Sequence, residues 1–247
     1  MVDLRWLWRA RKFRRHWCRS EIEAMRLVLH RGQVAIDIGA HKGGWTYWMR
    51  KAVGPSGQVL AFEPQNELAT ALRGWMPRGW TNVEVLNACA GDHEGQIELF
   101  LPGTGSPAAS TVRAVAAAEP GGAEAQARQV PLRTLDAEVR RRGWSQVHFL
   151  KVDVEGAEAA VLRGAAETIE ASRPTLLIEC EQRHLTSQGS TVAEVFAPLL
   201  AMGYRAWFFA DGRQIPFKEF QVSVHQSSEG ERFWDLPGYA NNFLLVP

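Results

Sequence analysis

Cysteine, long apolar runs and net charge are all scarce in this sequence of 247 residues, and each absence excludes a class of protein. The three cysteines, Cys18, Cys89 and Cys180, lie far apart without C-x-x-C spacing, so neither a disulfide framework nor a structural zinc site is predicted. No segment has the roughly 18 apolar residues of a membrane-spanning helix, and none has the pattern of a signal peptide. These absences favour a soluble cytoplasmic protein in a reducing compartment.

The charges nearly cancel, with 28 lysines and arginines against 27 acidic residues and a formal net charge of +1. This average favours no polyanionic partner, and no nucleic-acid partner is expected. The hydrophobic fraction of 46% suffices for a substantial core. The length suits one large α/β domain.

The beginning of the chain departs from this average, and residues 1–31 are expected to form a basic, aromatic helical extension ahead of a domain over residues 32–247. Its aromatic side chains could cover the domain or a partner subunit in an oligomer. They could instead lie on an anionic membrane surface or grip a polyanionic substrate through residues 1–19. Polar and apolar positions do not separate onto two helix faces, which favours the first interpretation. Residues 1–19 hold Asp3 among Arg5, Trp6, Trp8, Arg9, Arg11, Lys12, Phe13, Arg14, Arg15, Trp17 and Arg19.

From residue 33 onward, short apolar runs alternate with helical patterns, which predicts a parallel sheet covered on both faces. Strands are expected at 33–38, 58–63, 83–88, 147–153 and 175–180, and helices at 44–53, 66–76 and 155–172. Runs at 96–102 and 128–134 flank a Gly/Ala/Pro-rich segment, 103–127, which is predicted to be a mobile insertion or lid. Runs at 204–210 and 241–247 suit an antiparallel pair closing one sheet edge.

The stretch VAIDIGAHKGG, residues 34–44, is an apolar run that ends in Asp37 and then in glycines. Glycine after a strand permits a tight turn and close approach of a ligand to the backbone, and the following helix points its free amides at that ligand. The next predicted strand ends at Glu63, where a carboxylate can accept hydrogen bonds from both hydroxyls of a ribose. Together the two features predict an adenosine site.

The methyl donor S-adenosylmethionine fits this site better than a dinucleotide. GAHKGG lacks the G-x-G-x-x-G pattern that a pyrophosphate needs, so an NAD-dependent dehydrogenase is the less favoured alternative. Asp37 would also repel a phosphate, whereas it suits an ammonium or a sulfonium cation.

Four motifs resemble those of the FkbM-type S-adenosylmethionine-dependent methyltransferases: DIGAHKGGWT, FEP, VPLRTLD and FLKVDVEGAEAAVLRGA. The resemblance covers residues 33–182 and the terminal NNFLLVP. It implies a Rossmann-like class I methyltransferase fold, with a seven-stranded, mostly parallel sheet, helices on both faces and an antiparallel edge strand. It also implies methylation of hydroxyl groups, often on sugars or macrocyclic natural products.

The same resemblance implies a set of cofactor contacts. His41 stands where the family usually has asparagine. The implied contacts are Asp37, Gly39, Ala40, His41 and Gly43 near the methionine end, Glu63 and Pro64 near the ribose, Asn87, Ala88 and Cys89 near the adenine, and Asp153.

Acidic residues are expected to gather where the acceptor reacts, because the carboxyl ends of parallel strands meet at one sheet edge. Asp153 or Glu179 could remove the proton of the acceptor hydroxyl, and His184 offers an imidazole nearby. Lys151 shares a strand face with Asp153, which predicts either an internal ion pair or a role in orienting the substrate.

Asp153 and Glu179 also resemble, by strand position, the acids that hold magnesium in catechol-type O-methyltransferases. Two ligands do not make a site, so dependence on a divalent metal stays open. The favoured hypothesis is an O-methyltransferase for a sugar hydroxyl in a glycan or glycosylated metabolite. The alternatives are methylation of a polyketide-type hydroxyl and a non-catalytic, membrane-tethered nucleotide-binding scaffold.

Overall fold

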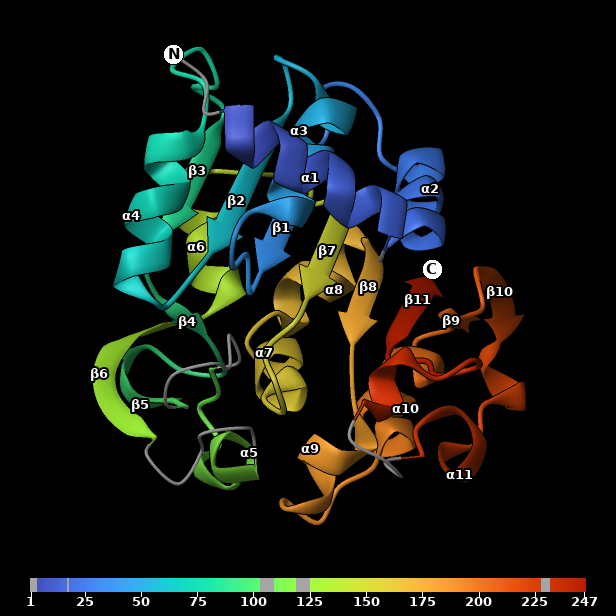
Figure 1. Cartoon of the computed structure of the whole chain (residues 1–247). Helices are drawn as coiled ribbons and strands as arrows, with labels where there is room; N and C mark the ends of the chain where they lie inside the picture. The colour runs from blue at the N-terminus through green and yellow to red at the C-terminus, as the bar shows by residue number, and fades with distance from the viewer. Residues whose placement is uncertain (1–3, 17, 103–108, 119–124, 228–231) are drawn as a thin grey trace.

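A computed structural model of the chain describes residues 4–16, 18–102, 109–118, 125–227 and 232–247. Its centre is an eight-stranded sheet with the strand order β10-β9-β11-β8-β7-β1-β2-β3 (Figure 1). The strands are β1 (Val34–Ile38), β2 (Gln58–Phe62), β3 (Val83–Leu86), β7 (Phe149–Val152), β8 (Thr175–Glu179), β9 (Arg205–Ala210), β10 (Arg213–Pro216) and β11 (Asn242–Val246).

The sheet is mostly parallel. β1 pairs in parallel with β2 and β7, β2 with β3, and β7 with β8. β11 lies between β8 and β9 and is antiparallel to both, and β10 adds an antiparallel strand at the edge. The predicted class I methyltransferase fold is confirmed, with β10 as a strand beyond the expected seven. The predicted pair at 204–210 and 241–247 is antiparallel, but β10 occupies the edge outside it.

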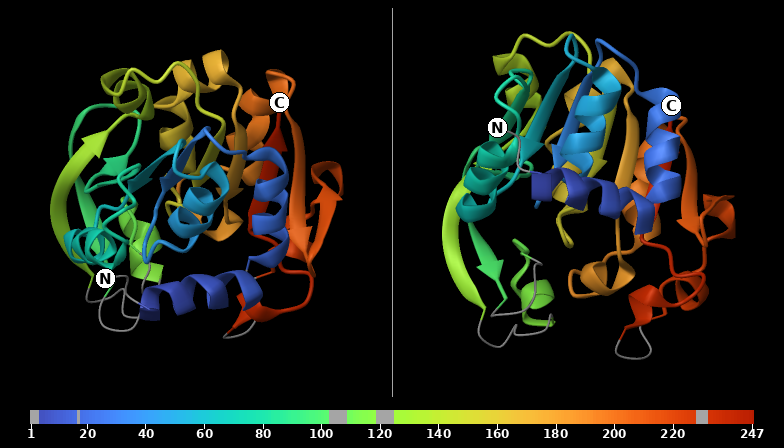
Figure 2. Two further views of the ribbon diagram at one scale, coloured as in Figure 1. Left: turned by 90° about the horizontal axis from the view of Figure 1, so that it is seen from above. Right: turned by 45° about the horizontal axis from the view of Figure 1, so that its top comes forward.

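Helices cover both faces of the sheet (Figure 2). Ala35 of β1 packs in the cluster formed with α2 and α3, whereas Ile36 packs in the cluster formed with α6, α7, α8 and α10, because successive strand residues point to opposite faces. Among the described residues no helix could span a membrane. The two layers are α1 (Leu4–His16), α2 (Arg19–Val28), α3 (Gly44–Val53) and α4 (Asn66–Trp75), and α6 (Leu135–Arg141), α7 (Glu158–Arg163), α8 (Ala166–Ser172) and α10 (Val192–Ala201).

The helix predicted over 155–172 is wrong as a single element, because α7 and α8 are separate. Gly164 lies between them, and a Cβ there would stand 1.8 Å from the carbonyl oxygen of Gly91. The start of the helix also differs, since Glu155 and Gly156 adopt left-handed backbone angles with φ of 51° and 100°. They therefore form a turn ahead of α7.

A second sheet joins β4 (Cys89–Ala90), β6 (Gln126–Arg133) and β5 (Gly95–Leu101) in that order. The runs predicted at 96–102 and 128–134 form its antiparallel pair. Much of the predicted insertion, residues 103–108 and 119–124, lies outside the described residues. In the described part of the insertion, Ser110 forms a β-bridge with Phe100, and α5 (Arg113–Ala118) follows.

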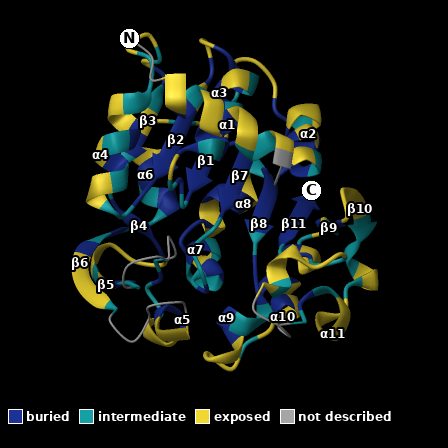
Figure 3. Cartoon of the chain, in the orientation of Figure 1, coloured by how far each residue is buried: buried dark blue, intermediate teal, exposed yellow. Residues whose placement is uncertain are grey.

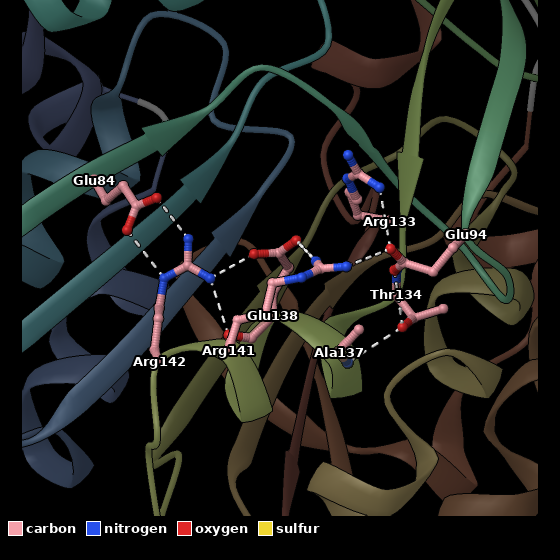
Figure 4. Close-up of polar contacts among 8 residues, drawn as sticks. All are labelled: Glu84, Glu94, Arg133, Thr134, Ala137, Glu138, Arg141 and Arg142. Carbon is pink, nitrogen blue, oxygen red and sulfur yellow. Dashed lines mark hydrogen bonds and ion pairs between the residues drawn. The ribbon is translucent and has the colours of Figure 1, made fainter.

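Ion pairs around α6 tie the second sheet to the main one (Figure 4). Arg142, the residue that follows α6, donates to Glu84 of β3 at 2.6 Å and 3.0 Å, and Arg141 donates to Glu94 at 2.7 Å. Glu138 accepts from both arginines. Burial alone would raise the pKa of Glu94, but the amide of Thr134 and the nearby guanidiniums lower this pKa to about 2. This network fixes β5 and β6 beside the carboxyl ends of the main strands.

Helix α1 packs across α3. The Trp6 side chain is 1% exposed, and its Nε1 donates to the carbonyl of Lys42 at 2.9 Å. Trp48 of α3 donates in return to the carbonyl of Ala10 at 2.9 Å. The N-terminal helix therefore holds the turn that precedes α3.

Candidate active site

A cavity of about 290 Å³ opens where β1, β2 and β7 end. Parallel strands bring residues from distant parts of the chain to this edge, and the adenosine site expected there stays a prediction. The cavity lining includes Gly39, His41, Glu63, Pro64, Ala88, Cys89, Thr111, Asp153, Glu155, Arg183 and Trp234.

The turn after β1 has a backbone conformation that only a few residue types adopt readily. Gly39 has a φ of 85°, and a Cβ there would stand 1.8 Å from the carbonyl oxygen of Asp153. The amides of Gly39 and Ala40 donate to the carbonyl of Phe62 at 3.1 Å and 2.9 Å. His41 has a φ of 49°, in the left-handed region that histidine, like asparagine, enters more readily than most residues. Backbone conformation thus accounts for histidine at this position.

Glu63 lies opposite this turn and is 3% exposed. Its carboxylate accepts the amide of His41 at 2.6 Å and the amide of Gln65 at 2.8 Å. Burial raises the pKa of Glu63 to about 7, despite these two hydrogen bonds. Burial also lowers the pKa of the neighbouring His41 to about 4, so this imidazole is neutral at physiological pH. The cavity therefore has a buried carboxyl group at the end of β2.

Three residues predicted at the methionine end stand behind the cavity wall. Asp37 accepts the Thr46 hydroxyl at 2.5 Å through Oδ2, whereas its Oδ1 has no hydrogen-bond partner among the described residues. Burial raises the pKa of Asp37 to about 6. Ala40 is buried, and Gly43, with a φ of 74°, packs beneath Trp6 as the residue before α3.

Of the residues predicted near the adenine, Ala88 and Cys89 line the cavity and Asn87 does not. The Asn87 amide donates to the carbonyls of Glu63 and Pro64, both at 2.9 Å. Asn87 therefore braces the turn that carries Glu63. Burial raises the pKa of the Cys89 thiol to about 12, so it stays protonated.

Lys151 is fully buried between two carboxylates. Its Nζ lies 3.6 Å from Asp153 and 3.8 Å from Glu179. Burial alone would lower the pKa of Lys151, but these two charges raise it above its ordinary value. Burial and the charge of Asp153 raise the pKa of Glu179. Asp153 lines the cavity, whereas Lys151 and Glu179 do not, so this arrangement is an internal ion cluster that presents one carboxylate to the cavity.

The cluster does not fit the alternative of a magnesium site. The ammonium group of Lys151 already stands between Asp153 and Glu179, where a divalent cation would have to bind. Across the described ranges, no three histidine, cysteine or acidic side chains gather in a way that could hold a metal ion.

His184 is buried beside Glu155 and does not line the cavity. Its Nδ1 lies 3.3 Å from Oε2 of Glu155. Burial, together with the charges of Asp153 and Glu179, raises the pKa of Glu155 well above its ordinary value. The Ser110 hydroxyl donates to the Glu155 carbonyl at 2.7 Å, which helps to hold this left-handed residue in place.

Two residues at the cavity mouth were not predicted from the sequence. Arg183 belongs to α9 (Gln182–Thr186), pairs with Glu181 at 2.8 Å and lies over the ring of Phe233. Trp234 belongs to the short helix η3 (Phe233–Asp235) and is 48% exposed. Neither residue belongs to a motif or a periodic pattern, so no residue spacing in the sequence indicates a site there.

Comparison with known proteins adds the family. Residues 37–206, well over half of the chain, match the family model described as the methyltransferase FkbM domain. The solved methyltransferase FkbM from Methylobacillus flagellatus KT is 13% identical with a TM-score of 0.53, over 91% of this chain and 50% of that one. At this identity the likeness shows the fold alone. A methyltransferase from Aquifex aeolicus gives 16% identity and a TM-score of 0.47, over 83% of this chain and 93% of that one.

A curated relative matches only a short stretch. The tRNA (adenine(58)-N(1))-methyltransferase catalytic subunit of Cryptococcus neoformans var. neoformans serotype D is 37% identical over 83 residues, which is 31% of this chain and 19% of that protein. This chain thus spans about a fifth of that relative. The family model covers the turn after β1, Glu63 and the ion cluster around Lys151, and by this match the chain belongs to the FkbM family of S-adenosylmethionine-dependent methyltransferases.

Proposed function

We propose that this protein transfers a methyl group from S-adenosylmethionine to a hydroxyl group of a sugar, in a glycan or a glycosylated metabolite. The observation that carries the proposal is one cavity whose lining combines Glu63 with Asp153 and Trp234. Glu63 suits a nucleoside, and Asp153 and Trp234 offer a base and an aromatic surface in the same cavity.

The residues present fit the cofactor. Glu63 holds the ribose hydroxyls, and Gly39, whose missing side chain lets the ends of β1 and β7 approach closely, lines the same cavity. Oδ1 of Asp37, which is buried and has no hydrogen-bond partner among the described residues, supplies negative charge near a cationic methionine end. When bound, S-adenosylmethionine supplies an electrophilic methyl group on a sulfonium.

Asp153 takes the proton of the acceptor hydroxyl. Of the acids predicted to react, Asp153 and Glu179, it is the one that lines the cavity. Lys151 and Glu179 act as positioning residues, because the buried ammonium fixes the Asp153 carboxylate from behind. His184 positions Glu155 through its Nδ1, 3.3 Å from Oε2 of Glu155. A positioned base of this kind typically contributes about 10²–10⁴-fold to the rate.

The mouth of the cavity suits a sugar. The half-exposed ring of Trp234 can pack on the apolar face of a pyranose, while Thr111 and Arg183 offer hydrogen-bond donors to its hydroxyls. Leu99 and Ala109 in the same lining favour a second candidate, a polyketide-type hydroxyl.

Turnover of Asp153→Asn is expected to fall by about 100-fold or more, because the amide cannot accept the hydroxyl proton. The measurement is transfer of a labelled methyl group to a panel of sugars, glycosides and polyketide alcohols. Glu170→Gln, on the exposed side of α8, is the control and should keep wild-type turnover. If no sugar in the panel accepts the label while a polyketide does, the second candidate replaces the first. Unchanged turnover in Asp153→Asn would remove Asp153 as the base.

Cofactor affinity should depend on the ionisation of Glu63. Because the pKa of Glu63 is raised to about 7, the carboxyl is protonated below this pH and ionised above it. Only the ionised form accepts hydrogen bonds through both oxygens, so the nucleoside should bind more tightly as pH rises from about 6 to 8. Calorimetry with 5′-methylthioadenosine, which has the ribose but no amino-acid group, isolates this site. At pH 8 Glu63→Gln should bind about tenfold more weakly, and its affinity should not change with pH. A pH-dependent affinity that persists in Glu63→Gln would contradict the assignment.

A further inference from the structure

Helix α1 has an inner and an outer face of different kinds. Trp6, Ala10 and Phe13 point inward, the first two 1% and 2% exposed. Leu4, Trp8, Arg11 and Arg15 recur at the spacing that aligns side chains along one side of a helix, and all four are exposed. The outer face thus combines apolar and basic side chains. Aromatic residues on both sides of the helix explain why its sequence shows no clean separation of polar and apolar positions.

The apolar residues of the outer face are strongly exposed. Leu4 is 76% exposed and Trp8 is 62% exposed, one turn apart. Among the described residues, the ring of Trp8 has one ring interaction, with the ammonium of Lys12 on the same helix, 5.3 Å from the ring centre. The packing of α1 on the domain is provided by Trp6 on the opposite side.

Positive charge concentrates around these apolar side chains. The described sequence of α1, LRWLWRARKFRRH, contains no acidic residue. Arg14 and Arg19 both approach Glu23, at 3.6 Å and 3.1 Å. Within the described part of the chain no acidic side chain pairs with Arg11 or Arg15, and these four arginines line one shallow hollow with Trp48. The charge of this surface is therefore only slightly neutralised from within the protein.

The position of α1 leaves this face accessible along its whole length. Figure 2 shows α1 lying lengthwise along the outside of the molecule, over α3. Figure 3 shows exposed residues along its outward side. The hollow near Arg11 and Arg15 shares no residue with the lining of the active-site cavity. A large flat partner can therefore contact α1 without entering the active site.

We propose that the outer face of α1 docks on a membrane surface that contains anionic lipids. Trp8 and Leu4 enter the boundary between headgroups and acyl chains, and Arg11 and Arg15 bind lipid phosphates. A nucleic acid would use the cations but offers no apolar layer to Leu4, so the pairing of Leu4 with Trp8 favours lipid. The contact is peripheral, because α1 remains packed on α3 through its other face.

Flotation of the full chain with vesicles tests the proposal. The protein should float with phosphatidylcholine vesicles that contain phosphatidylglycerol, and should not float with phosphatidylcholine alone. Reversing two charges, in Arg11→Glu with Arg15→Glu, should weaken this binding about tenfold or more. Trp8→Ala should weaken it at both low and high salt, because the apolar contribution is not screened. The control is Arg213→Glu with Lys218→Glu, at two exposed positions in β10 and just after it. This variant makes the same change of net charge away from α1 and should keep wild-type binding.

All variants should bind S-adenosylmethionine like the wild type, which shows that they are folded. Equal flotation of the Arg11/Arg15 variant and the wild type would overturn the proposal, as would no flotation of the wild type with anionic vesicles. Retention of the wild type on immobilised single-stranded RNA, without vesicle binding, would reassign the surface to nucleic acid.

Discussion

Lys151→Met is expected to lower the free energy of unfolding by about 3 kcal/mol or more at pH 7, because it leaves two carboxylates at one site without their cation. The Lys151 side chain is 0% exposed, so water cannot replace its ammonium group next to Asp153 and Glu179. Methionine has similar length and leaves little cavity, so the loss reports charge. Urea unfolding followed by circular dichroism measures it.

The loss should shrink as the pH falls. Lys151 has a raised pKa, so its stabilising charge is fully present at every pH below its ordinary pKa of about 10.4. The pKa of Glu179 is raised already and rises further without Lys151, so acid protonates Glu179 in the folded variant and removes the repulsion with Asp153. The deficit is therefore largest near pH 8 and smaller near pH 5.

Two controls separate charge from packing. Lys218→Met, at an exposed lysine, should leave the stability nearly unchanged. Adding Glu179→Gln to Lys151→Met should recover part of the loss, because one of the two repelling charges is gone. Equal unfolding midpoints of Lys151→Met and wild type at pH 8 would show that the ion cluster contributes no stability.

Gly39→Ala is expected to abolish cofactor binding, with an affinity at least about 100-fold weaker, or to prevent folding. The added Cβ would stand 1.8 Å from the Asp153 carbonyl, a backbone atom that cannot rotate away, and the residue has a φ of 85°. To accept it, the ends of β1 and β7 would have to separate, which moves Asp153 and the turn that carries His41. Calorimetric titration with S-adenosylmethionine, together with a thermal melt, measures both effects.

Gly74→Ala is the matched control. Gly74 lies within α4, and a Cβ there would meet nothing within 4 Å. In a helix this change should stabilise the protein by about 0.5–1 kcal/mol and leave cofactor binding intact. Wild-type cofactor affinity in Gly39→Ala would mean that the tips of β1 and β7 tolerate separation and that the turn does not form the cofactor wall.

The parallel strands could be predicted from the sequence because each is a short, mostly apolar run, and β1 and β7 are buried along their whole length. Helix α3 was predicted at its observed bounds, 44–53, since Gly43 before it and Gly54 after it mark its ends. The close approach of Gly164, where the predicted helix divides, to the carbonyl of Gly91 could not be predicted, because Gly91 lies more than 70 residues away in the chain. Contacts between distant segments have no local signal.

In the site, too, residues with a local sequence signal could be predicted, whereas positions that depend on contacts between distant segments could not. Glu63 and Asp153 could be placed in one cavity because both follow strands that end at the same sheet edge. Asn87 and Lys151 lie at that edge too, but which side of the wall they occupy depends on side-chain packing. Arg183 and Trp234 come from segments without periodic pattern and enter the cavity only through the tertiary fold.

The place of β11 between β8 and β9 matters while the chain is being synthesised. Residues 242–246 come after both neighbours in the sequence, yet β8 and β9 pair with each other only through them. Until that segment leaves the ribosome, β8 and β9 each present an unpaired edge, the kind of surface at which nascent chains aggregate. We therefore expect the yield of folded protein to depend on chaperones that shield these two edges until β11 has been synthesised.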